Sequence, residues 1–445
     1  MRSRGADRHD VELVRFLWAD LNGVLRATGV AHAALPARMR SGIGLAATRY
    51  AAHLLDVAPP VDGLDDVREV RATADPGTFG LLPHAPGAAA VLTDLVRPDG
   101  TPWPGCPRGF LRGAIDRAAG LGFEVVAAFE PEFTLLRRDD EGALVPLDDS
   151  VTFEHDAFDL TNDFVVEVCR ALRAHGIEVE LYHPEFAAGQ HEMTIGSAPA
   201  LRAADNHVWQ RVLIRGIART YGWHATFAPA PLPGLRGNGN HLHLSLWREG
   251  VGNAFADPAG ALGLSPTARH FIAGVLEHLP GLTALLAPSL NSYRRLQRGM
   301  WSGAFGCYGP DNREAAVRVP APLRGDERGS ANIEVKPCDG TANPYLALGA
   351  VIHAGLDGVV RELDPGPPVA GALADLSEAE LDERGVRWSP RSLEEAVDAL
   401  ARDEFLLAAL GSPLSELYLA VKRADILDLK GLDDAAHHAL YTARY

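Results

Sequence analysis

The sequence predicts an α+β protein, in which a small β-rich domain over residues 1–105 precedes a larger domain of alternating strands and helices over residues 106–445. Three observations lead to this prediction. Residues 11–26 read as strand, Asn-Gly turn and strand, which is typical of a β-hairpin. Residues 97–107 contain four prolines and have the composition of a linker. From residue 124 onward, short apolar runs alternate with longer amphipathic runs, as strands and helices do.

The individual elements follow from turn residues and helix-end signals. After the hairpin, turns with Pro and Gly separate short apolar runs, of which residues 89–95 give the clearest strand. Pro107 suits the first turn of a helix that runs to Ala119 and ends at Gly120. In the larger domain we expect strands at 124–136, 177–182 and 242–247, helices at 159–175, 200–221, 265–286, 344–361 and 392–410, and the least regular part at 364–390.

Composition and charge exclude several classes of function. The 445 residues are 47% hydrophobic and 22% charged, as in ordinary globular proteins, and the net charge is −16. Nucleic acid or an anionic membrane is therefore not expected as the main partner, because both need a basic face. Residues 1–7 lead into no apolar segment, and no apolar run of about 20 residues occurs, so we expect neither secretion nor membrane insertion. The four cysteines show no C-x-x-C spacing, which favours a reducing cytoplasm.

The most informative stretch runs from Phe129 to Phe133, where Glu130 and Glu132 interrupt an apolar run. Buried carboxylates are costly unless something cationic meets them. On a strand the two side chains share one face roughly 6 to 7 Å apart, which suits two neighbouring ions better than one shared ion. Pro131 lacks a ladder donor, so we expect it at a sheet edge or a bulge. The alternative is a pair of solvated glutamates on an edge strand.

Two further stretches contain candidate metal ligands. Glu185 ends one predicted strand and Glu192 opens the next, and the Gly-containing turn between them can bring both carboxylates to one point. Hard divalent ions such as Mg²⁺ and Mn²⁺ take such oxygen-rich sites. His241 and His243 share one strand face, after a Gly- and Asn-rich segment that allows the backbone to approach a ligand closely. The alternatives are a solvated loop and an ordinary histidine pair.

Basic side chains recur in three later segments. Arg295 follows Asn-Ser-Tyr-Arg, Arg313 and Arg318 lie five residues apart, and Lys336 comes two residues after Glu334. Guanidinium groups match phosphate and carboxylate oxygens, and phosphoryl transfer depends mainly on positioning and on neutralising charge. The alternative for each of them is an ordinary surface residue.

The order and spacing of these four sets resemble the glutamine synthetase superfamily, and more closely its γ-glutamyl-amine and polyamine ligases than its ammonia-using members. The resemblance covers nearly the whole chain, from the hairpin at residues 18–23 to residues 337–347 and the closing helices. It implies a small β-grasp-like N-terminal domain and a large α/β catalytic domain whose curved antiparallel sheet forms a funnel-shaped site. It also implies a homo-oligomer, a dodecamer of two stacked hexameric rings with active sites between neighbouring subunits.

The resemblance implies two divalent metals, Mg²⁺ or Mn²⁺, in each site. One metal falls to Glu132, Glu185 and Glu192, and the other falls to Glu130, His241 and Glu334. The strand geometry of Glu130 and Glu132 agrees with this division, because it separates the two carboxylates.

The resemblance also implies the binding of ATP and of glutamate. ATP matches Glu180, His243, Ser245, Arg313 and Arg318. Glutamate and the transferred phosphate match Gly237, Arg295, Arg313 and Lys336, the last in place of a family arginine. Arg295, Arg313 and Lys336 are the expected catalytic residues. The implied reaction transfers the γ-phosphoryl group of ATP to the side-chain carboxylate of glutamate, and an amine then attacks the acyl phosphate.

Three departures from ammonia-using members bear on the amine. Trp301 occupies the place of an acidic flap residue, residues 41–47 replace an Asp-Gly-Ser-Ser loop, and Thr152 replaces a pocket tyrosine. The groups that hold ammonium in the family are thus missing, and an apolar or aromatic lining favours an amine with a carbon chain. Trp301 is accordingly an expected substrate-binding residue. Arg236 in place of an asparagine and Ala230 in place of a lysine leave the acid substrate open.

The main hypothesis is an ATP-dependent ligase that joins glutamate to an organic amine. Three alternatives remain: an ammonia-using glutamine synthetase with an unusual flap, a related ligase for another carboxylic acid, and a catalytically silent member that serves as a binding or structural ring. The complete metal set argues against the silent ring, because a protein released from catalysis has no need to bury six such ligands.

Overall fold

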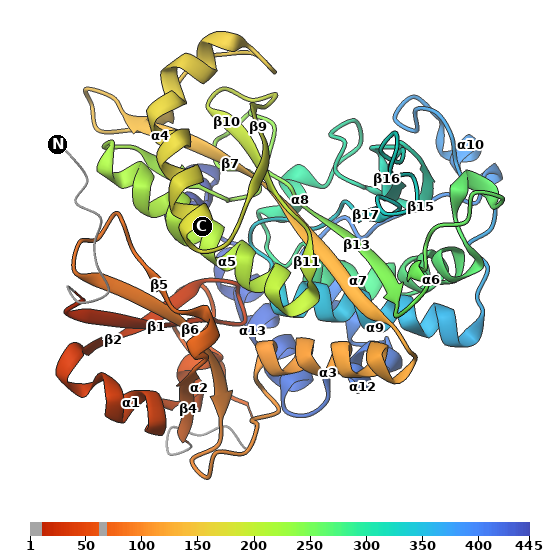
Figure 1. Ribbon diagram of the computed structural model, residues 1–445. Helices are drawn as coiled ribbons and strands as arrows, with labels where there is room; N and C mark the ends of the chain where they lie inside the picture. The colour runs from red at the N-terminus through yellow and green to blue at the C-terminus, as the bar shows by residue number, and fades with distance from the viewer. Residues whose placement is uncertain (1–10, 62–68) are drawn as a thin grey trace.

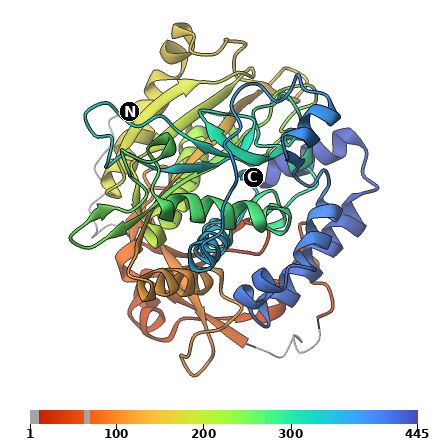
Figure 2. The same ribbon diagram turned by 90° about the vertical axis from the view of Figure 1, so that its right-hand side faces the viewer.

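Figures 1 and 2 show the computed structural model, which describes residues 11–61 and 69–445. The α+β prediction is confirmed, because a small sheet lies at the N-terminal end and a large sheet with most of the helices forms the rest (Figure 1). The expectation made for residues 1–7 lies outside the described residues. Within the described chain, no single helix has the length and apolarity to cross a membrane. Among the described helices, one pair, Glu404–Leu410 and Leu414–Leu429, meets that test when taken together, by length and composition alone, and this pair is bent by 111°.

The N-terminal sheet begins with the predicted hairpin, whose strands β1 (Leu13–Ala19) and β2 (Leu25–Ala31) pair antiparallel. The strand expected at 89–95 is β6 (Ala88–Val96), which lies parallel to β1. The strand order is β2-β1-β6-β4-β3, with β5 beside β6. The remaining elements of this part are β3 (Ile43–Ala46), β4 (Glu69–Ala74), β5 (Gly80–Leu81), α1 (Leu35–Ser41) and α2 (Ala47–Tyr50).

The Asn-Gly turn of the hairpin packs against the larger part of the molecule. Gly23 has a φ of +71°, and a Cβ atom there would lie 2.5 Å from the carbonyl oxygen of Thr341. Asn343 donates a side-chain N–H to the carbonyl oxygen of Asp20 at 2.9 Å. Glycine alone combines this φ with such a close approach. The turn that signals the hairpin therefore also fixes the N-terminal sheet against the start of α9 (Pro344–Arg361).

The large sheet carries the candidate site. Its strand order is β18-β15-β16-β17-β13-β7-β10-β9. The antiparallel prediction is correct except for one pair, β15 with β16, which is parallel. The strands are β7 (Glu124–Arg138), β8 (Leu144–Pro146), β9 (Val179–Pro184), β10 (Gln190–Ile195), β11 (Ala198–Pro199), β12 (His224–Thr226), β13 (Asn240–Arg248), β14 (Gly252–Asn253), β15 (Phe305–Pro310), β16 (Ala315–Val319), β17 (Ile333–Val335) and β18 (Arg387–Trp388).

The central strand β7 corrects the prediction of an edge position for Pro131, because β7 lies inside the sheet, between β13 and β10. Pro131 is the last residue of β7 that pairs with β13, opposite Asn240. Glu132 is the first that pairs with β10, opposite Glu192. On the side opposite β13, the partner of β7 changes from β11, which pairs as far as Ala127, to β10, which pairs from Glu132 onward, so the missing N–H of the proline falls in the gap between two ladders. A proline is tolerated there without a loss from either ladder.

The helices agree with the sequence except at two breaks. The stretch 265–286 is divided into α6 (Pro266–Glu277) and α7 (Leu279–Leu286), and 392–410 into α11 (Leu393–Leu400) and α12 (Glu404–Leu410). The stretch 364–390, expected to be irregular, contains only α10 (Glu378–Glu383) and β18. The other helices are α3 (Pro107–Gly120), α4 (His155–Ala174), α5 (Ala200–Thr220), α8 (Ser292–Arg295), α13 (Leu414–Leu429) and α14 (Asp434–Arg444).

His278 lies at the first of these breaks and connects two other helices. Its Nε2 atom is 3.1 Å from Oδ2 of Asp357 in α9, and its Nδ1 atom is 2.8 Å from Oδ2 of Asp403, the N-cap residue of α12. The ring of Phe405 stacks on the imidazole, with centroids 4.7 Å apart. Burial lowers the pKa of His278, but the two carboxylates outweigh this effect and raise it above its ordinary value.

We expect this junction to stabilise the protein most at mildly acidic pH. Because the pKa of His278 is higher in the folded than in the unfolded chain, its contribution is complete below the unfolded value of about 6.5. That contribution is lost as the pH rises through the folded-state pKa. The thermal unfolding midpoint of the wild type should therefore exceed that of His278→Gln by more at pH 6 than at pH 9. The control His155→Gln alters a histidine that is 83% exposed and should show no such trend; equal differences for His278→Gln at both values would contradict the expectation.

Candidate active site

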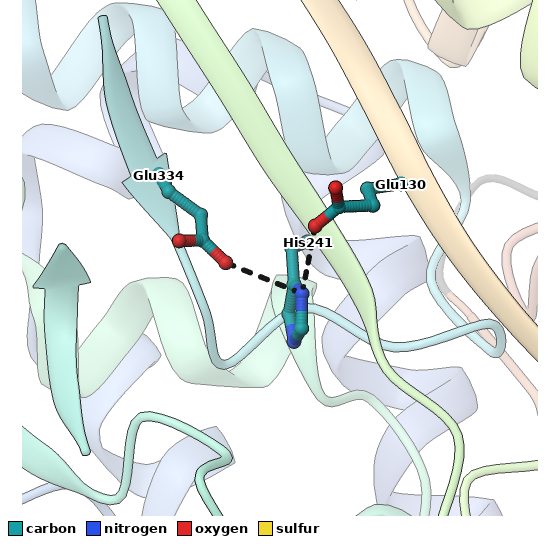
Figure 3. Close-up of side chains that lie close together, drawn as sticks. All are labelled: Glu130, His241 and Glu334. Carbon is teal, nitrogen blue, oxygen red and sulfur yellow. Dashed lines mark hydrogen bonds and ion pairs between the residues drawn. The ribbon is translucent and has the colours of Figure 1, made fainter. Parts of the chain in front are cut away.

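Three neighbouring strands bring an acid, a histidine and a second acid to one point. His241 of β13 lies opposite Glu130 of β7, and Glu334 of β17 lies opposite His243 of β13. The Nδ1 atom of His241 is 3.3 Å from Oε2 of Glu130 and 3.2 Å from Oε1 of Glu334 (Figure 3). One ligand atom from each of the three residues lies within 4.8 Å of the other two. The structure thus brings together the three residues that the resemblance assigned to one metal.

A second acidic group lies at the facing ends of β9 and β10. It consists of Glu185, Glu192 and His183, whose ligand atoms also lie within 4.8 Å of one another. Nδ1 of His183 is 3.6 Å from Oε1 of Glu185, and Nε2 is 3.5 Å from Oε1 of Glu192. Glu185 and Glu192 are brought together as expected, but the third member is a histidine to which the sequence analysis gave no role.

Glu132 lies between the two groups. Its Oε2 atom accepts hydrogen bonds from Nε2 of Gln190 at 2.8 Å and from the backbone N–H of Gly239 at 2.9 Å. Its Oε1 atom is 3.8 Å from Nε2 of His241. Two amide N–H donors therefore hold Glu132 in this structure, one of them from Gln190 of β10. Through His241 the same side chain also contacts the first group.

Three of the predicted basic residues surround the first group. Glu334 receives Nζ of Lys336 on Oε1 and Nη1 of Arg318 on Oε2, each at 2.9 Å. Nε2 of His241 is 3.2 Å from Nη2 of Arg295 and 3.3 Å from Nζ of Lys336. Arg295, Lys336 and Glu334 are all buried. Arg295, Arg318 and Lys336 therefore do not scatter over the surface, which was the alternative interpretation for them.

The two groups differ in their charge balance. Burial and the neighbouring Glu132 raise the pKa of Glu185 to about 7, and burial with Glu130 raises the pKa of Glu192 well above its ordinary value. In the first group burial acts in the same direction, but Lys336 and His241 hold the pKa of Glu334 far below its ordinary value. Nearby cations thus neutralise the first group, whereas the second group holds negative charge that its own neighbours do not balance.

Both groups fit a divalent cation. Their donors are carboxylate oxygens and imidazole nitrogens, which Mg²⁺ and especially Mn²⁺ accept. The Nδ1 atom of His183 is buried and has no hydrogen-bond partner among the described residues. A buried unpaired nitrogen and buried crowded carboxylates both destabilise the protein alone. A bound cation relieves both, so the residues present suit the metals that the sequence implied.

The glycines before His241 serve the packing of the chain itself. A Cβ atom on Gly239 would lie 2.7 Å from Nη2 of Arg295 and 2.7 Å from Nε2 of His241. A Cβ atom on Gly237 would lie 1.8 Å from the carbonyl oxygen of Pro229. The carbonyl oxygen of Gly237 accepts a hydrogen bond from Nε2 of Gln190 at 2.9 Å. The backbone at these glycines therefore does approach other groups closely: the side chains of Arg295 and His241 at Gly239, and the backbone of Pro229 at Gly237.

The residues expected to bind ATP fall into two sets. His243 and Arg318 adjoin the first group, and Ser245 lies two residues beyond His243 on β13. Nε2 of His243 is 3.5 Å from Oε2 of Glu130, and this carboxylate outweighs burial and raises the pKa of His243 to about 9. Glu180 lies apart from them on β9, where a register shift leaves it outside the regular pairing, and it is exposed. Next to His243 lies a largely apolar cavity of about 240 Å³, whose wall includes Asn332, the hydrogen-bond partner of His243 Nδ1 at 2.9 Å.

Three exposed aromatic side chains lie beside the second acidic group, and we call them the aromatic corner: Phe153, Phe186 and Trp301. Phe186 directly follows Glu185, and its ring stands edge-on to that of Trp301 with centroids 5.2 Å apart. Phe153 stands edge-on to His183 at 4.8 Å. Their exposed fractions are 64%, 46% and 44% in chain order, and every other Phe, Tyr or Trp side chain in the described chain is more buried.

Trp301 is held in an unusual backbone conformation. Its φ is +54°, in the left-handed region that bulky residues avoid, and the flanking Gly299 and Gly303 also have positive φ. A non-glycine residue in such a region costs on the order of 1–3 kcal/mol and persists only when its surroundings impose it. The loop therefore presents the indole toward Phe186 at an energetic cost.

Two arginines face the rings of the aromatic corner. The guanidinium carbon of Arg236 is 4.9 Å from the ring centroid of Phe186 and 5.9 Å from that of Trp301, and that of Arg313 is 5.9 Å from Trp301. Both arginines are exposed, and neither side chain has a hydrogen bond or ion pair with any residue that the structure describes. Arg313 thus contacts Trp301, whereas Arg318 is paired with Glu334.

Sequence reasoning missed His183, Phe186 and Phe153. His183 could have been found, because it lies two residues before Glu185 and so shares a strand face with it. Phe186 and Phe153 gave no usable signal, because exposed aromatics cannot be told from core aromatics by residue type alone. Their exposure depends on how the loops after β9 and before α4 fold.

Comparison with known proteins agrees with this geometry. The family description "Glutamine synthetase N-terminal domain" matches residues 3–103, and "Glutamine synthetase, catalytic domain" matches residues 104–438. A gamma-glutamylpolyamine synthetase of Streptomyces coelicolor is 38% identical over 435 residues, 96% of this chain and 92% of that protein. A glutamine synthetase of Halobacterium salinarum is 37% identical over 379 residues, 83% of this chain and 82% of that protein. A solved structure described as a novel glutamine synthase homolog superposes with a TM-score of 0.87 at 35% identity, covering 98% of this chain and 99% of that one. The chain therefore belongs to the glutamine synthetase family of ATP-dependent ligases.

Proposed function

We propose that this ligase joins the γ-carboxylate of glutamate to an organic amine and forms a γ-glutamyl amide. The observation that carries the proposal is the aromatic corner. Exposed rings lie directly beside the second acidic group, where Trp301 stands in place of the acidic residue of ammonia-using relatives. Aromatic rings bind alkyl chains and cationic heads, but their contacts offset little of the free energy that a small hydrated ammonium ion loses when it is desolvated.

The proposal assigns the acidic groups to two divalent metals. Glu130, His241 and Glu334 would hold one, and Glu185 and Glu192, with His183 or Glu132 as third partner, would hold the other. Divalent ions in such sites neutralise the charge of the phosphates and orient them for in-line transfer. His243, Ser245 and Arg318 would contact the nucleotide, with the neighbouring apolar cavity available to its base.

The basic residues would act on the acid substrate and the phosphoryl group. In the first step the γ-carboxylate attacks the terminal phosphorus of ATP and releases ADP. Arg313 has no hydrogen-bond or ion-pair partner in the described chain, so the N–H groups of its guanidinium are free to bind the moving phosphoryl oxygens. Lys336 and Arg295 hold positive charge next to His241 and Glu334. In the second step the amine nitrogen attacks the acyl carbon and displaces phosphate with the loss of a proton.

A panel of acceptors tests the proposal. Purified protein with glutamate, ATP and Mg²⁺ should release phosphate and form a γ-glutamyl amide, detected by mass spectrometry, with at least one organic amine. The panel contains short alkylamines, ethanolamine, diamines and polyamines beside ammonium. The value of kcat/KM for the best amine should exceed that for ammonium about tenfold or more, the scale on which a pocket discriminates by a few methylene groups. If ammonium matches or exceeds every amine, the protein is an ordinary glutamine synthetase.

A second negative outcome has a different meaning. If ammonium and all amines fail while ATP and Mn²⁺ still bind, glutamate is not the acid substrate or the protein is a silent ring. Arg236 and Ala230 depart from the family pattern. The first of these two explanations to test would therefore be a different acid substrate.

The wider assembly belongs to the same proposal. We infer a division into an N-terminal domain at 1–105 and a catalytic domain at 106–445, supported by the family matches that meet at residues 103 and 104. A dodecamer of two hexameric rings and a location in the cytoplasm are part of the proposal, and the resemblance to the family supports them. The outward-facing aromatic corner is consistent with a site that a neighbouring subunit completes.

A further inference from the structure

The charge around the aromatic corner bears on which amines it can accept. This inference rests on the proposed function and concerns the far end of the acceptor, the end away from the nitrogen that reacts. One side of the corner is acidic, because Glu185 directly precedes Phe186 and lies within the second acidic group. The other side is basic, because the guanidinium of Arg236 lies 4.9 Å from the centroid of Phe186.

Arg236 is the cation that the proposed chemistry leaves unused. Arg313 also lies over Trp301, but its charge is taken up by the phosphoryl group in the proposed reaction. Arg295 and Arg318 are turned to His241 and Glu334. Arg236 has no carboxylate, carbonyl or hydroxyl partner in the part of the chain that the structure describes. A guanidinium that stacks on aromatic rings keeps its N–H groups at the ring edges free for an oxygen acceptor.

We infer that the acceptor is an amine whose far end carries a carboxylate or a similar acidic group, and that Arg236 selects for it. The reacting amine end points toward the metal site around Glu185, where the acyl phosphate forms in the proposed function, and the carbon chain lies on Phe186 and Trp301. The acidic end then meets the guanidinium of Arg236, which matches it in charge and in fork geometry. A diamine or polyamine places a second ammonium against that guanidinium, and like charges in contact disfavour binding.

Four acceptors of equal length separate charge from size: 4-aminobutyrate, 4-aminobutan-1-ol, butylamine and 1,4-diaminobutane. With saturating glutamate, ATP and Mg²⁺, kcat/KM should be highest for 4-aminobutyrate and lowest for 1,4-diaminobutane. The ratio between these two should be on the order of tenfold or more, since one charge-assisted hydrogen bond has that effect. Arg236→Gln should bring the four values together, and Arg236→Glu should make 1,4-diaminobutane the better of the two charged acceptors. Butylamine should change little in either variant.

The control is a second arginine stacked on a tryptophan. The guanidinium carbon of Arg391 lies 4.1 Å from the ring centroid of Trp388, on the exposed surface and outside the candidate site. Arg391→Glu makes the same change of charge and should leave the order of the four acceptors as in the wild type.

Two results overturn the inference without touching the proposed function. The first is a wild-type preference for butylamine or 1,4-diaminobutane over 4-aminobutyrate. The second is an Arg236→Gln variant with a raised KM for glutamate and an unchanged order of acceptors, which would place Arg236 on the acid substrate. If only ammonium supports turnover, the proposed function fails and this inference fails with it.

Discussion

Replacing Glu334 with glutamine should lower Mg²⁺-dependent turnover by roughly a hundred- to a thousandfold or more, the range found when one charge-stabilising group is removed from an active site. Glu334 is only 1% exposed, and its carboxylate holds Lys336 and Arg318 at 2.9 Å and His241 at 3.2 Å. In the proposed function the same carboxylate holds a divalent metal. Glutamine keeps the shape and one acceptor oxygen but removes the charge on which both roles depend.

Metal binding separates the two roles. Titration of the variant with Mn²⁺, followed by calorimetry, should show the loss of one class of sites, whereas the second class, around Glu185 and Glu192, should remain. Glutamine is preferred to alanine because removing one partner of a buried ion pair costs about 3–5 kcal/mol and endangers the fold. Circular dichroism and gel filtration check that the variant is assembled as the wild type is. Glu141→Gln, an exposed glutamate in a loop, is the matched control and should change neither turnover nor Mn²⁺ binding.

Wild-type turnover and unchanged Mn²⁺ binding in Glu334→Gln would exclude Glu334 as a metal ligand. Loss of turnover with unchanged Mn²⁺ binding would instead assign Glu334 to the positioning of Lys336 and Arg318, which is a different role. Only the combined loss agrees with Glu334 as a ligand of the metal.

The strand geometry of the site could be predicted because the period of a strand is fixed. Residues two apart on one strand share a face, so the sequence alone pairs Glu130 with Glu132 and His241 with His243. Their convergence could not be predicted from spacing, because it depends on which strands become neighbours. Here β17, β13 and β7 are adjacent in space although Glu130 and Glu334 are far apart in the sequence. The resemblance to a known family supplied that order.

The errors arose where a local rule has more than one structural solution. Pro131 needs a position without a ladder hydrogen bond, and the sheet provides one inside, at a change of partner strand, as well as at its edge. His278 reads as an ordinary helix residue, but its contacts with Asp357 and Asp403 hold it at a break between two helices. In both cases the deciding partner lies far away in the sequence. The local sequence pattern therefore limits the conformations that a segment can adopt, and tertiary contacts determine which of them it adopts.

Trp301→Glu should shift the acceptor preference from organic amines toward ammonium. The substitution removes an aromatic surface that packs on an alkyl chain and introduces a carboxylate that attracts a small cation and accepts its proton. We expect kcat/KM for the best organic amine to fall about tenfold or more and kcat/KM for ammonium to rise. Both changes shift the ratio of the two values toward ammonium. The KM for ATP should change less than the amine preference, because Trp301 touches neither the first acidic group nor the cavity beside His243 in the described chain.

The two arginines near Trp301 limit how far this shift can go. Each guanidinium carbon, of Arg236 and of Arg313, is 5.9 Å from the indole centroid, so a carboxylate at position 301 is within reach of both cations. An ion pair with either of them reduces the attraction of the new carboxylate for ammonium. The double variant Trp301→Glu with Arg236→Gln should therefore use ammonium better than Trp301→Glu alone. No difference between the two would mean that the new side chain points away from Arg236.

Trp301→Gly completes the argument, because stability and specificity should change in opposite directions. The backbone at position 301 has a φ of +54°, which glycine adopts without strain, and the indole is 44% exposed, so its removal loses little burial. The thermal unfolding midpoint of Trp301→Gly should therefore equal or exceed that of the wild type, while turnover with organic amines falls. A residue kept for folding would show the reverse, with a lowered midpoint and an unchanged order of acceptors. If the loss of Trp301 stabilises the protein and also impairs the use of organic amines, the function of this strained, exposed side chain is to bind the acceptor.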